Sequence, residues 1–136
     1  MSLEPKPTFT GQEYLDWERQ QDTRHEYFDG EIFAMTGASR KHNLVCGNTF
    51  SALHAQMRGG SCEVYNNDMR VKVSETGMYT YPDIVAACDN PVFEDAAVDT
   101  LINPVLIIEV LSGSTEPYDR GAKFLHYRTL PSLRDY

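Results

Sequence analysis

Hydrophobic and polar positions along this 136-residue chain fall into short patterned runs that turn residues separate. Residues 10–13, Thr-Gly-Gln-Glu, fit a capping box and precede several apolar side chains, so a short amphipathic helix is predicted over about residues 10–20. Two strand-like runs, residues 25–28 and 31–35, flank Asp29-Gly30, a dipeptide typical of a type I′ turn. The first part of the chain is therefore predicted to form a helix and a β-hairpin.

The middle of the chain begins with a long helical stretch. It runs from about residue 39 to residue 58, with Ser39 as the predicted N-cap and Gly59-Gly60 as the stop signal. The acidic loop that covers residues 89–103 carries no strong pattern. Strand-like runs are predicted at residues 62–65, 69–73 and 82–87.

The most apolar run, residues 104–111, contains a single carboxylate, Glu109, among large aliphatic side chains. The pattern predicts a strand that is buried on both faces. An ionised carboxylate without a partner in such a place costs several kcal/mol, so a metal ion, a Lys or Arg, or a raised pKa must compensate Glu109. A turn-rich loop at residues 111–115 and a helix over about residues 117–129, which Pro131 ends, follow this strand.

The order of helix, hairpin, long helix, three or four strands and helix predicts an α+β (mixed α/β) fold. No repeat, low-complexity segment or linker divides the chain, so residues 1–136 are expected to form one domain. Residues 132–136 follow a helix stop, where another strand is expected to begin, so the domain is predicted to lack its C-terminal strands. An open sheet edge left in this way invites pairing with a second copy, and a homodimer is one hypothesis.

Composition limits the size of the core and the cellular compartment that we expect for the protein. Hydrophobic residues make up 41% of the chain, enough for a moderate core. The three cysteines, Cys46, Cys62 and Cys88, show no metal-ligand spacing and are interpreted as small buried thiols of a reducing compartment, not as a disulfide framework. Since neither a signal peptide nor a membrane-length apolar run is evident, a cytoplasmic protein without membrane contact is predicted.

The net charge of −8, from 20 acidic and 12 basic residues, argues against a protein that coats DNA through its overall field. It does not exclude a metal-dependent nuclease, because divalent ions neutralise the carboxylates of such a site while local Lys and Arg contact phosphates.

Asp83 and Glu109 form the first candidate site. If their strands are neighbours in register, both carboxylates project from one face of the sheet and repel each other unless a cation lies between them. Carboxylate oxygens suit Mg²⁺ or Mn²⁺. The alternative is that Asp83 caps a strand start and Glu109 pairs with one buried Lys or Arg.

Lys123 is the candidate base. It shares a helix stripe with Asp119 and Tyr127, and the helix can fold back over the end of the Glu109 strand, where the amine could hold a water nucleophile or stabilise a phosphate. An exposed pair with Asp119 is the simpler alternative. His42, in the first turn of the long helix, and Glu26, near the hairpin turn, are weaker candidates for contacting a phosphate and for serving as a third acid, and either is equally explained as a surface residue.

These motifs together resemble the Uma2 (Uma-two) family of putative restriction endonucleases, within the PD-(D/E)XK nuclease-like superfamily. The resemblance covers about residues 10–136 and rests on five motifs in order: residues 26–32, His42, residues 82–85, residues 107–115 and residues 119–124.

The resemblance implies a restriction-endonuclease-like core, with a central mixed sheet flanked by helices, and Mg²⁺-dependent hydrolysis of DNA. Asp83 matches the aspartate of the Pro-Asp motif, and Glu109 matches the acid of the next strand. Leu111 stands where the superfamily has its lysine, and Lys123 matches a basic position on the following helix. Glu26 and His42 match positions that face the site, and Gly113 replaces a proline that the family often has.

The leading hypothesis is a Mg²⁺- or Mn²⁺-dependent DNA endonuclease in which Asp83, Glu109 and Glu26 bind metal while Lys123 and His42 assist catalysis. The alternative is a catalytically inactive module that keeps the nuclease fold and acts through protein partners. In that case Asp83, Glu109 and Lys123 form a salt-bridged cluster that needs no metal.

Overall fold

The structure, a computed structural model, describes residues 8–112 and 119–136, without the side chains of residues 119 and 120. Its helical elements are α1 (Gly11–Glu18), α2 (Arg40–Met57), the π-helical turn η1 (Asp119–Lys123) and α4 (Phe124–Tyr127). Its strands are β1 (His25–Phe28), β2 (Glu31–Ala34), β3 (Cys62–Asn66), β4 (Arg70–Val73), β5 (Met78–Thr80), β6 (Ile84–Cys88), β7 (Thr100–Leu101) and β8 (Leu106–Ile108).

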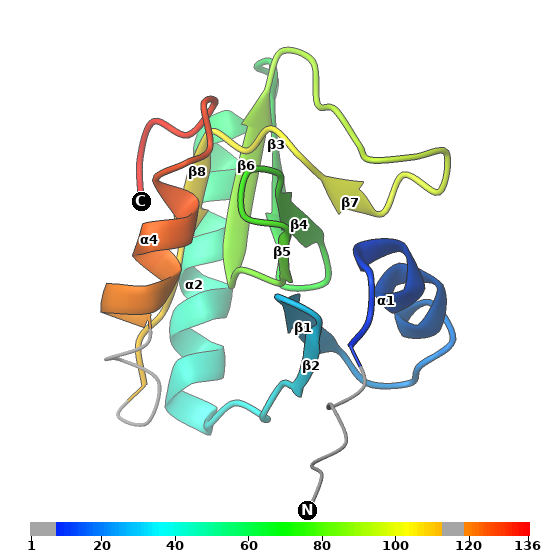
Figure 1. Cartoon of the computed structure of the whole chain (residues 1–136). Coiled ribbons are helices and arrows are strands. Elements are labelled where there is room, and N and C mark those ends of the chain that lie inside the picture. The colour runs from blue at the N-terminus through cyan, green and yellow to red at the C-terminus, as the bar shows by residue number, and fades with distance from the viewer. Residues whose placement is uncertain (1–7, 113–118) are drawn as a thin grey trace, which may run out of the picture.

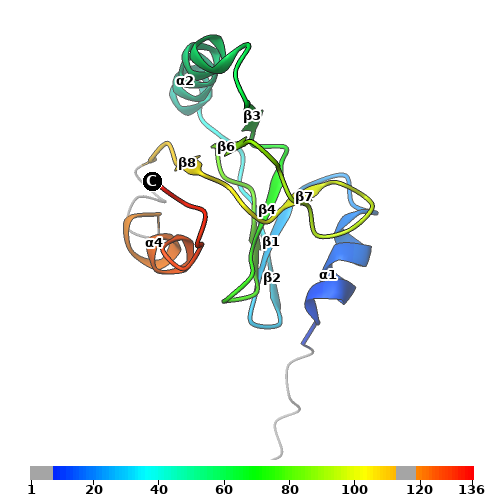
Figure 2. The ribbon, with the colours of Figure 1, turned by 90° about the horizontal axis from the view of Figure 1, so that it is seen from above.

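The strands form a five-stranded sheet in the order β2-β1-β5-β4-β7 and a three-stranded sheet in the order β3-β6-β8. The larger sheet is mixed, because β4 and β7 run parallel while its other neighbours run antiparallel. Helix α1 lies on one side of this sheet and α4 on the other, and α2 lies beside the smaller sheet (Figures 1 and 2). The predicted mixed α+β class is therefore confirmed.

Alternating side chains on β4 separate the two faces of the larger sheet. Val71 and Val73 belong to the main apolar core, together with Val85, Ile107 and Tyr127. The opposite face holds a smaller core under α1, formed by Tyr14, Leu15, Tyr27 and Tyr79. Strands β6 and β8 contribute to the main core, so their ends are held in fixed positions beside α4.

Locally encoded elements match their predictions. The Thr10 side chain and Glu13 form the predicted capping box of α1, and Ser39 caps α2 by accepting a hydrogen bond from the backbone of His42. Asp29 and Gly30 have φ values of 48° and 82°, as a type I′ turn requires.

Several long-range elements differ from their predictions. Strands β5 and β7 were not predicted. Strand β8 is shorter than the apolar run, and of its residues only Ile107 is fully buried, so the strand is not buried on both faces. The loop predicted after Leu111 and the start of the last helix lie largely outside the described residues. At the far end of the chain, the backbone of Asp135 accepts a hydrogen bond from Ile107, beside β8.

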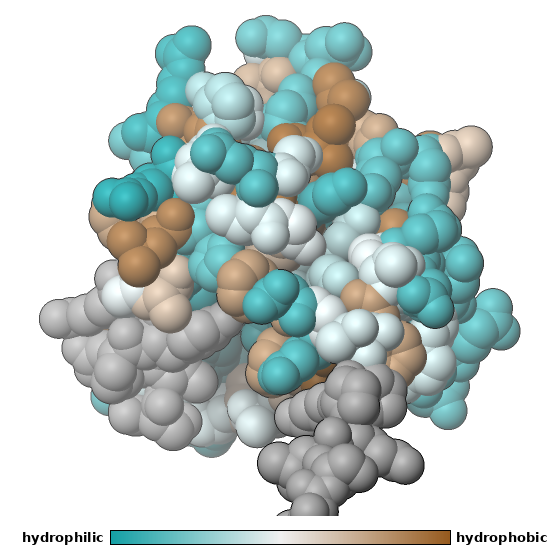
Figure 3. All heavy atoms as spheres, in the orientation of Figure 1, coloured by the Kyte–Doolittle hydropathy of each residue, from teal (hydrophilic) through white to brown (hydrophobic). Residues whose placement is uncertain are grey.

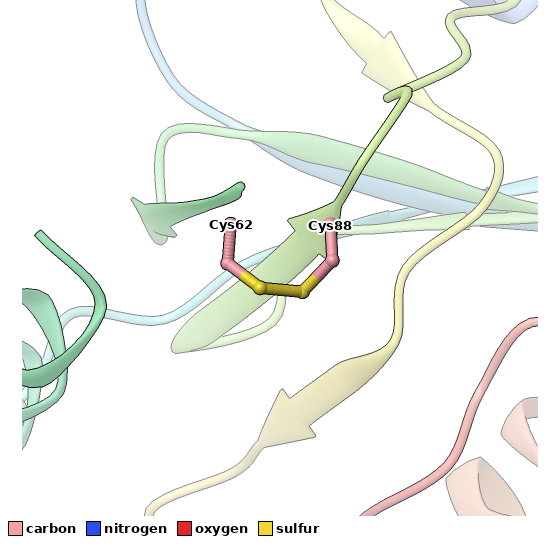
Figure 4. The surroundings of a disulfide bond; sticks show 2 residues. All are labelled: Cys62 and Cys88. Carbon is pink, nitrogen blue, oxygen red and sulfur yellow. A yellow bond between two sulfur atoms is a disulfide. The ribbon is translucent and has the colours of Figure 1, made fainter. Parts of the chain in front are cut away.

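The cysteine interpretation was wrong for two of the three residues. Cys62 and Cys88 are opposite one another in the β3–β6 ladder and form a disulfide bond (Figure 4). Cys46 on α2 has a free thiol. The spacing of the cysteines in the sequence does not reveal this pair, because residues 26 positions apart become neighbours only through the register of the two strands.

Hydrophobic side chains on the face seen in Figure 3 form small areas between hydrophilic ones. One such area lies over α4, where Phe124 and Leu125 are exposed. Within the residues that the structure describes, no helix combines the length and the apolar character needed to cross a membrane.

Candidate functional site

Asp83 and Glu109 lie at adjoining ends of two neighbouring strands. Strands β6 and β8 are antiparallel, with Ile84 opposite Ile108, so one further step along the two strands sets Asp83 across from Glu109. Residues at such opposite positions have Cβ atoms about 5 Å apart and point to the same face. The backbone N–H of Val110 donates a 2.7 Å hydrogen bond to Oδ2 of Asp83, which holds the Asp83 carboxylate against the end of β8.

Lys123, the last residue of η1, brings its amine close to Glu109 and to Glu26 on β1. Its Nζ lies 3.1 Å from Oε2 of Glu26 and 3.9 Å from Oε1 of Glu109. The lysine and Glu109 side chains are almost fully buried, at 7% and 6% exposure, and Glu26 is 18% exposed. The structure therefore brings Glu26, Glu109 and Lys123 together, although the first and last are about a hundred residues apart.

Two neutral hydroxyl groups complete the surroundings of the carboxylates. Tyr127 donates a 2.8 Å hydrogen bond to Oε1 of Glu109, and Thr80 donates one to the Glu26 carboxylate. Burial, and then the negative charge of Glu109, raise the pKa of Tyr127 well above its ordinary value. Tyr127 therefore stays protonated and acts as a donor to Glu109.

His42 and Cys46 approach Asp83 from α2. Nε2 of His42 lies 2.9 Å from the carbonyl oxygen of Val110 and 3.3 Å from Oδ2 of Asp83. Because a carbonyl oxygen only accepts, Nε2 carries a proton, and Nδ1 faces Sγ of Cys46 at 3.6 Å. Burial, followed by the negative charges of Asp83 and Glu109, raises the pKa of the Cys46 thiol to about 11.

The five residues predicted from the sequence thus gather around the end of β8. His42 lies against Asp83, and the amine of Lys123 lies between Glu26 and Glu109. Sequence reasoning missed the place of Cys46, although its spacing of four from His42 on a predicted helix puts the two on one helix face. It also missed Thr80, because β5 itself was not predicted.

A second polar network lies on the α1 side of the larger sheet. The buried Glu18 carboxylate accepts hydrogen bonds from the hydroxyl of Tyr81 and the backbone of His25, and Arg70 donates to Tyr81. Arg70 is buried, and Lys72 on the same strand pairs with Glu94. This network attaches α1 to the sheet and stands apart from the cluster around β8.

Comparison with known proteins places the geometry in context. The model of the Uma2 family, described as "Putative restriction endonuclease", matches residues 12–136. An uncharacterized protein of Synechocystis sp. (strain ATCC 27184 / PCC 6803 / Kazusa), slr1290, is 40% identical over 132 residues, which cover 97% of this chain and 68% of that protein. A second uncharacterized protein of that strain, sll1609, is 37% identical over 127 residues, which cover 93% of this chain and 72% of that protein.

A solved structure has the same fold. It is the crystal structure of a "putative nuclease belonging to DUF820" from Anabaena variabilis ATCC 29413, which superimposes with a TM-score of 0.74. The match covers 93% of this chain and 74% of that chain, at 19% sequence identity, so it shows the fold alone.

Proposed function

Because this chain belongs to the Uma2 family of restriction-endonuclease-like proteins, as its motifs indicated, we propose that it is a divalent-metal-dependent endonuclease that hydrolyses DNA phosphodiester bonds. The observation that carries the proposal is the meeting of Asp83 and Glu109 at the adjoining ends of β6 and β8, with the Lys123 amine 3.9 Å from Glu109. We further propose that residues 1–136 act as one domain, and a homodimer stays a prediction.

The donor set fits a hard divalent ion. Asp83 and Glu109 offer carboxylate oxygens on one face of the sheet, the chemistry that Mg²⁺ and Mn²⁺ prefer. Glu26 is proposed as an additional ligand from β1, on the far side of the Lys123 amine. An ion bound there supplies charge that shields a phosphate and lowers the pKa of a bound water.

The protein's own groups have separate tasks in this proposal. Lys123 holds its ammonium between Glu26 and Glu109, from where it can orient a water nucleophile. His42 presents its Nε2 proton beside Asp83 and can donate it to a phosphate oxygen. Arg40 and Lys41 are exposed in the first turn of α2, next to His42, and offer local positive charge to a DNA backbone despite the net charge of −8.

The test is cleavage of plasmid DNA with Mg²⁺ or Mn²⁺ by the wild type and by Asp83→Ala and Glu109→Ala. Loss of either carboxylate is expected to lower the cleavage rate at least about 100-fold, because removal of a group that only hydrogen-bonds a metal ligand already costs about 10- to 100-fold. Asp22→Ala, which removes an exposed carboxylate beyond α1, is the matched control and should cleave like the wild type. Equal cleavage by all four proteins contradicts the proposal.

A non-catalytic module is the second candidate, and the contacts of Lys123 favour it. Its amine already offsets charge on two glutamates, and His42 lies against Asp83, so the cluster is partly compensated without a metal ion. Calorimetric titration with Mn²⁺ separates the two candidates. No binding at millimolar Mn²⁺ supports the module, and binding that Asp83→Ala removes supports the nuclease.

A further inference from the structure

His42, Cys46 and Asp83 bring three different kinds of ligand atom together at the edge of the candidate site. Within the described part of the chain, one nitrogen, one sulfur and one carboxylate oxygen from these residues all lie within 4.8 Å of one another. We propose that they bind a transition-metal ion of the Zn²⁺ or Co²⁺ class, at a position distinct from the carboxylate site proposed for Mg²⁺. The two positions share only Asp83, and this inference holds whether or not the protein cleaves DNA.

The distances suit such an ion. Zn²⁺ bonds of about 2.1 Å to nitrogen or oxygen and 2.3 Å to sulfur place tetrahedral ligands about 3.4 to 3.6 Å apart. Nε2 of His42 lies 3.3 Å from Oδ2 of Asp83 and 3.9 Å from Sγ of Cys46. These two separations are within a few tenths of an ångström of the tetrahedral values, and the third, between Cys46 and Asp83, is within 4.8 Å. Modest movements of these side chains therefore bring the three ligands around an ion and leave a fourth position open.

The scaffold holds the ligands from two directions. His42 and Cys46 are one helical turn apart on α2, and the Ser39 side chain caps the first turn of that helix. Asp83 is fixed by its hydrogen bond from the backbone of Val110. The three residues are half-buried, so an ion can reach them from solvent and still bind in partly desolvated surroundings.

The ligand types determine which ion is preferred. Thiolate and imidazole suit Zn²⁺ and Co²⁺, whereas Mg²⁺ takes oxygen ligands and keeps much of its water. The site is therefore expected to discriminate strongly against Mg²⁺.

Binding has a defined proton balance. The Nε2–H bond to the Val110 carbonyl breaks, and the imidazole proton moves to Nδ1, which leaves Nε2 free to bind the ion. The Cys46 thiol releases its proton to solvent and binds as a thiolate, and Asp83 binds as a carboxylate. No oxidant or reductant takes part.

The experiment is titration of the whole chain with Co²⁺, without reductant so that the Cys62–Cys88 disulfide stays closed and Cys46 is the free thiol. We expect visible d–d bands of tetrahedral Co²⁺ together with a near-ultraviolet band from thiolate-to-cobalt charge transfer. Equimolar Zn²⁺ should remove both, and Mg²⁺ at the same concentration should leave both in place.

Matched variants assign the bands to this site. Cys46→Ser should abolish the charge-transfer band and weaken Co²⁺ binding more than about tenfold, and His42→Asn should weaken binding similarly. The double variant Cys62→Ser/Cys88→Ser, which removes the cysteines at the far end of β6, should keep the band. Absence of the band in the wild type, or its persistence in folded Cys46→Ser, overturns the inference.

Discussion

Lys123 is a buried cation held between two carboxylates, and a neutral residue of similar length tests what it does there. In Lys123→Met, Glu26 and Glu109 lose the ammonium that competes with a metal ion for their oxygens. We expect Mn²⁺ to bind more tightly in calorimetric titration, while DNA cleavage falls at least about 100-fold. Without metal, the free energy of unfolding should drop by about 3 kcal/mol, because removing one partner leaves buried charge uncompensated.

Lys41→Met is the matched control, since Lys41 is exposed on α2 and belongs to no cluster around β8. It should leave Mn²⁺ affinity and unfolding unchanged. Weaker Mn²⁺ binding by Lys123→Met would show that the lysine supports the metal site and does not compete for it.

Asp99 makes the folding stability of the chain depend on pH in the acid range. The Arg19 guanidinium, which hydrogen-bonds the Asp99 carboxylate, lowers the pKa of Asp99 to about 2. A lowered pKa in the folded state means that the contribution to stability is complete above the unfolded value of 3.8 and disappears as pH falls towards 2. Because Asp99 is 35% exposed, that contribution is discounted to about 1 kcal/mol.

Asp99→Asn should therefore destabilise the protein by about 1 kcal/mol in urea unfolding at pH 7, and the difference from the wild type should shrink below about pH 3. Asp22→Asn serves as a control with no expected effect. A difference that stays constant down to about pH 2 contradicts the assignment to the Asp99 charge.

The hairpin turn shows how an element depends on one glycine. Gly30 has a φ of 82°, and an added Cβ would lie 2.9 Å from Cβ of Thr8. Gly77, in the turn before β5, has a similar φ of 78° but nothing within 4 Å of an added Cβ. Both Gly→Ala changes should cost about 1 kcal/mol for the left-handed backbone, and Gly30→Ala should cost measurably more in urea unfolding. Equal losses would show that the contact with Thr8 relaxes freely.

The elements that sequence patterns predicted are those whose signals are local. The capping box of α1, the Asp29-Gly30 turn and the Ser39 cap of α2 depend on residues a few positions apart. Strands β5 and β7 are three and two residues long, too short for an alternating pattern to identify them. The π-helical turn that delivers Lys123 has no sequence pattern that distinguishes it from an α-helix.

The candidate site was predictable to the extent that strand alternation sets the face of a side chain. Asp83 and Glu109 share a face because β6 and β8 are neighbours whose register sets these two residues opposite each other. The contact of Lys123 with Glu26 could not be derived, since it depends on how β1 and η1 meet in three dimensions. Cys46 was set aside because no spacing between cysteines pointed to it, whereas its relevant partners are a histidine and an aspartate.

At the scale of the molecule, the larger sheet separates two polar systems. On the α1 side, Glu18 and Arg70 are satisfied by hydroxyl, backbone and carboxylate partners, and they hold the helix in place. On the other side, the groups around β8 include more acids than bases, an arrangement that attracts cations. Buried charge therefore holds α1 to the sheet on one face and gathers around the proposed binding site on the other.

The Cys62–Cys88 disulfide allows the stability of the fold to be tested separately from metal binding. Cys88 is the last residue of β6, whereas Asp83 directly precedes its first, so the cross-link and the proposed metal ligand Asp83 lie at opposite ends of one strand. For a sequence separation of 26, loop-closure entropy predicts that Cys62→Ser/Cys88→Ser costs about 3.5 kcal/mol in urea unfolding. Co²⁺ affinity of the folded variant should nevertheless equal that of the wild type, because β6 remains paired with β8 beside Asp83. If affinity falls along with stability, the two ends of β6 are coupled, and the cross-link helps to position the site as well as to stabilise the chain.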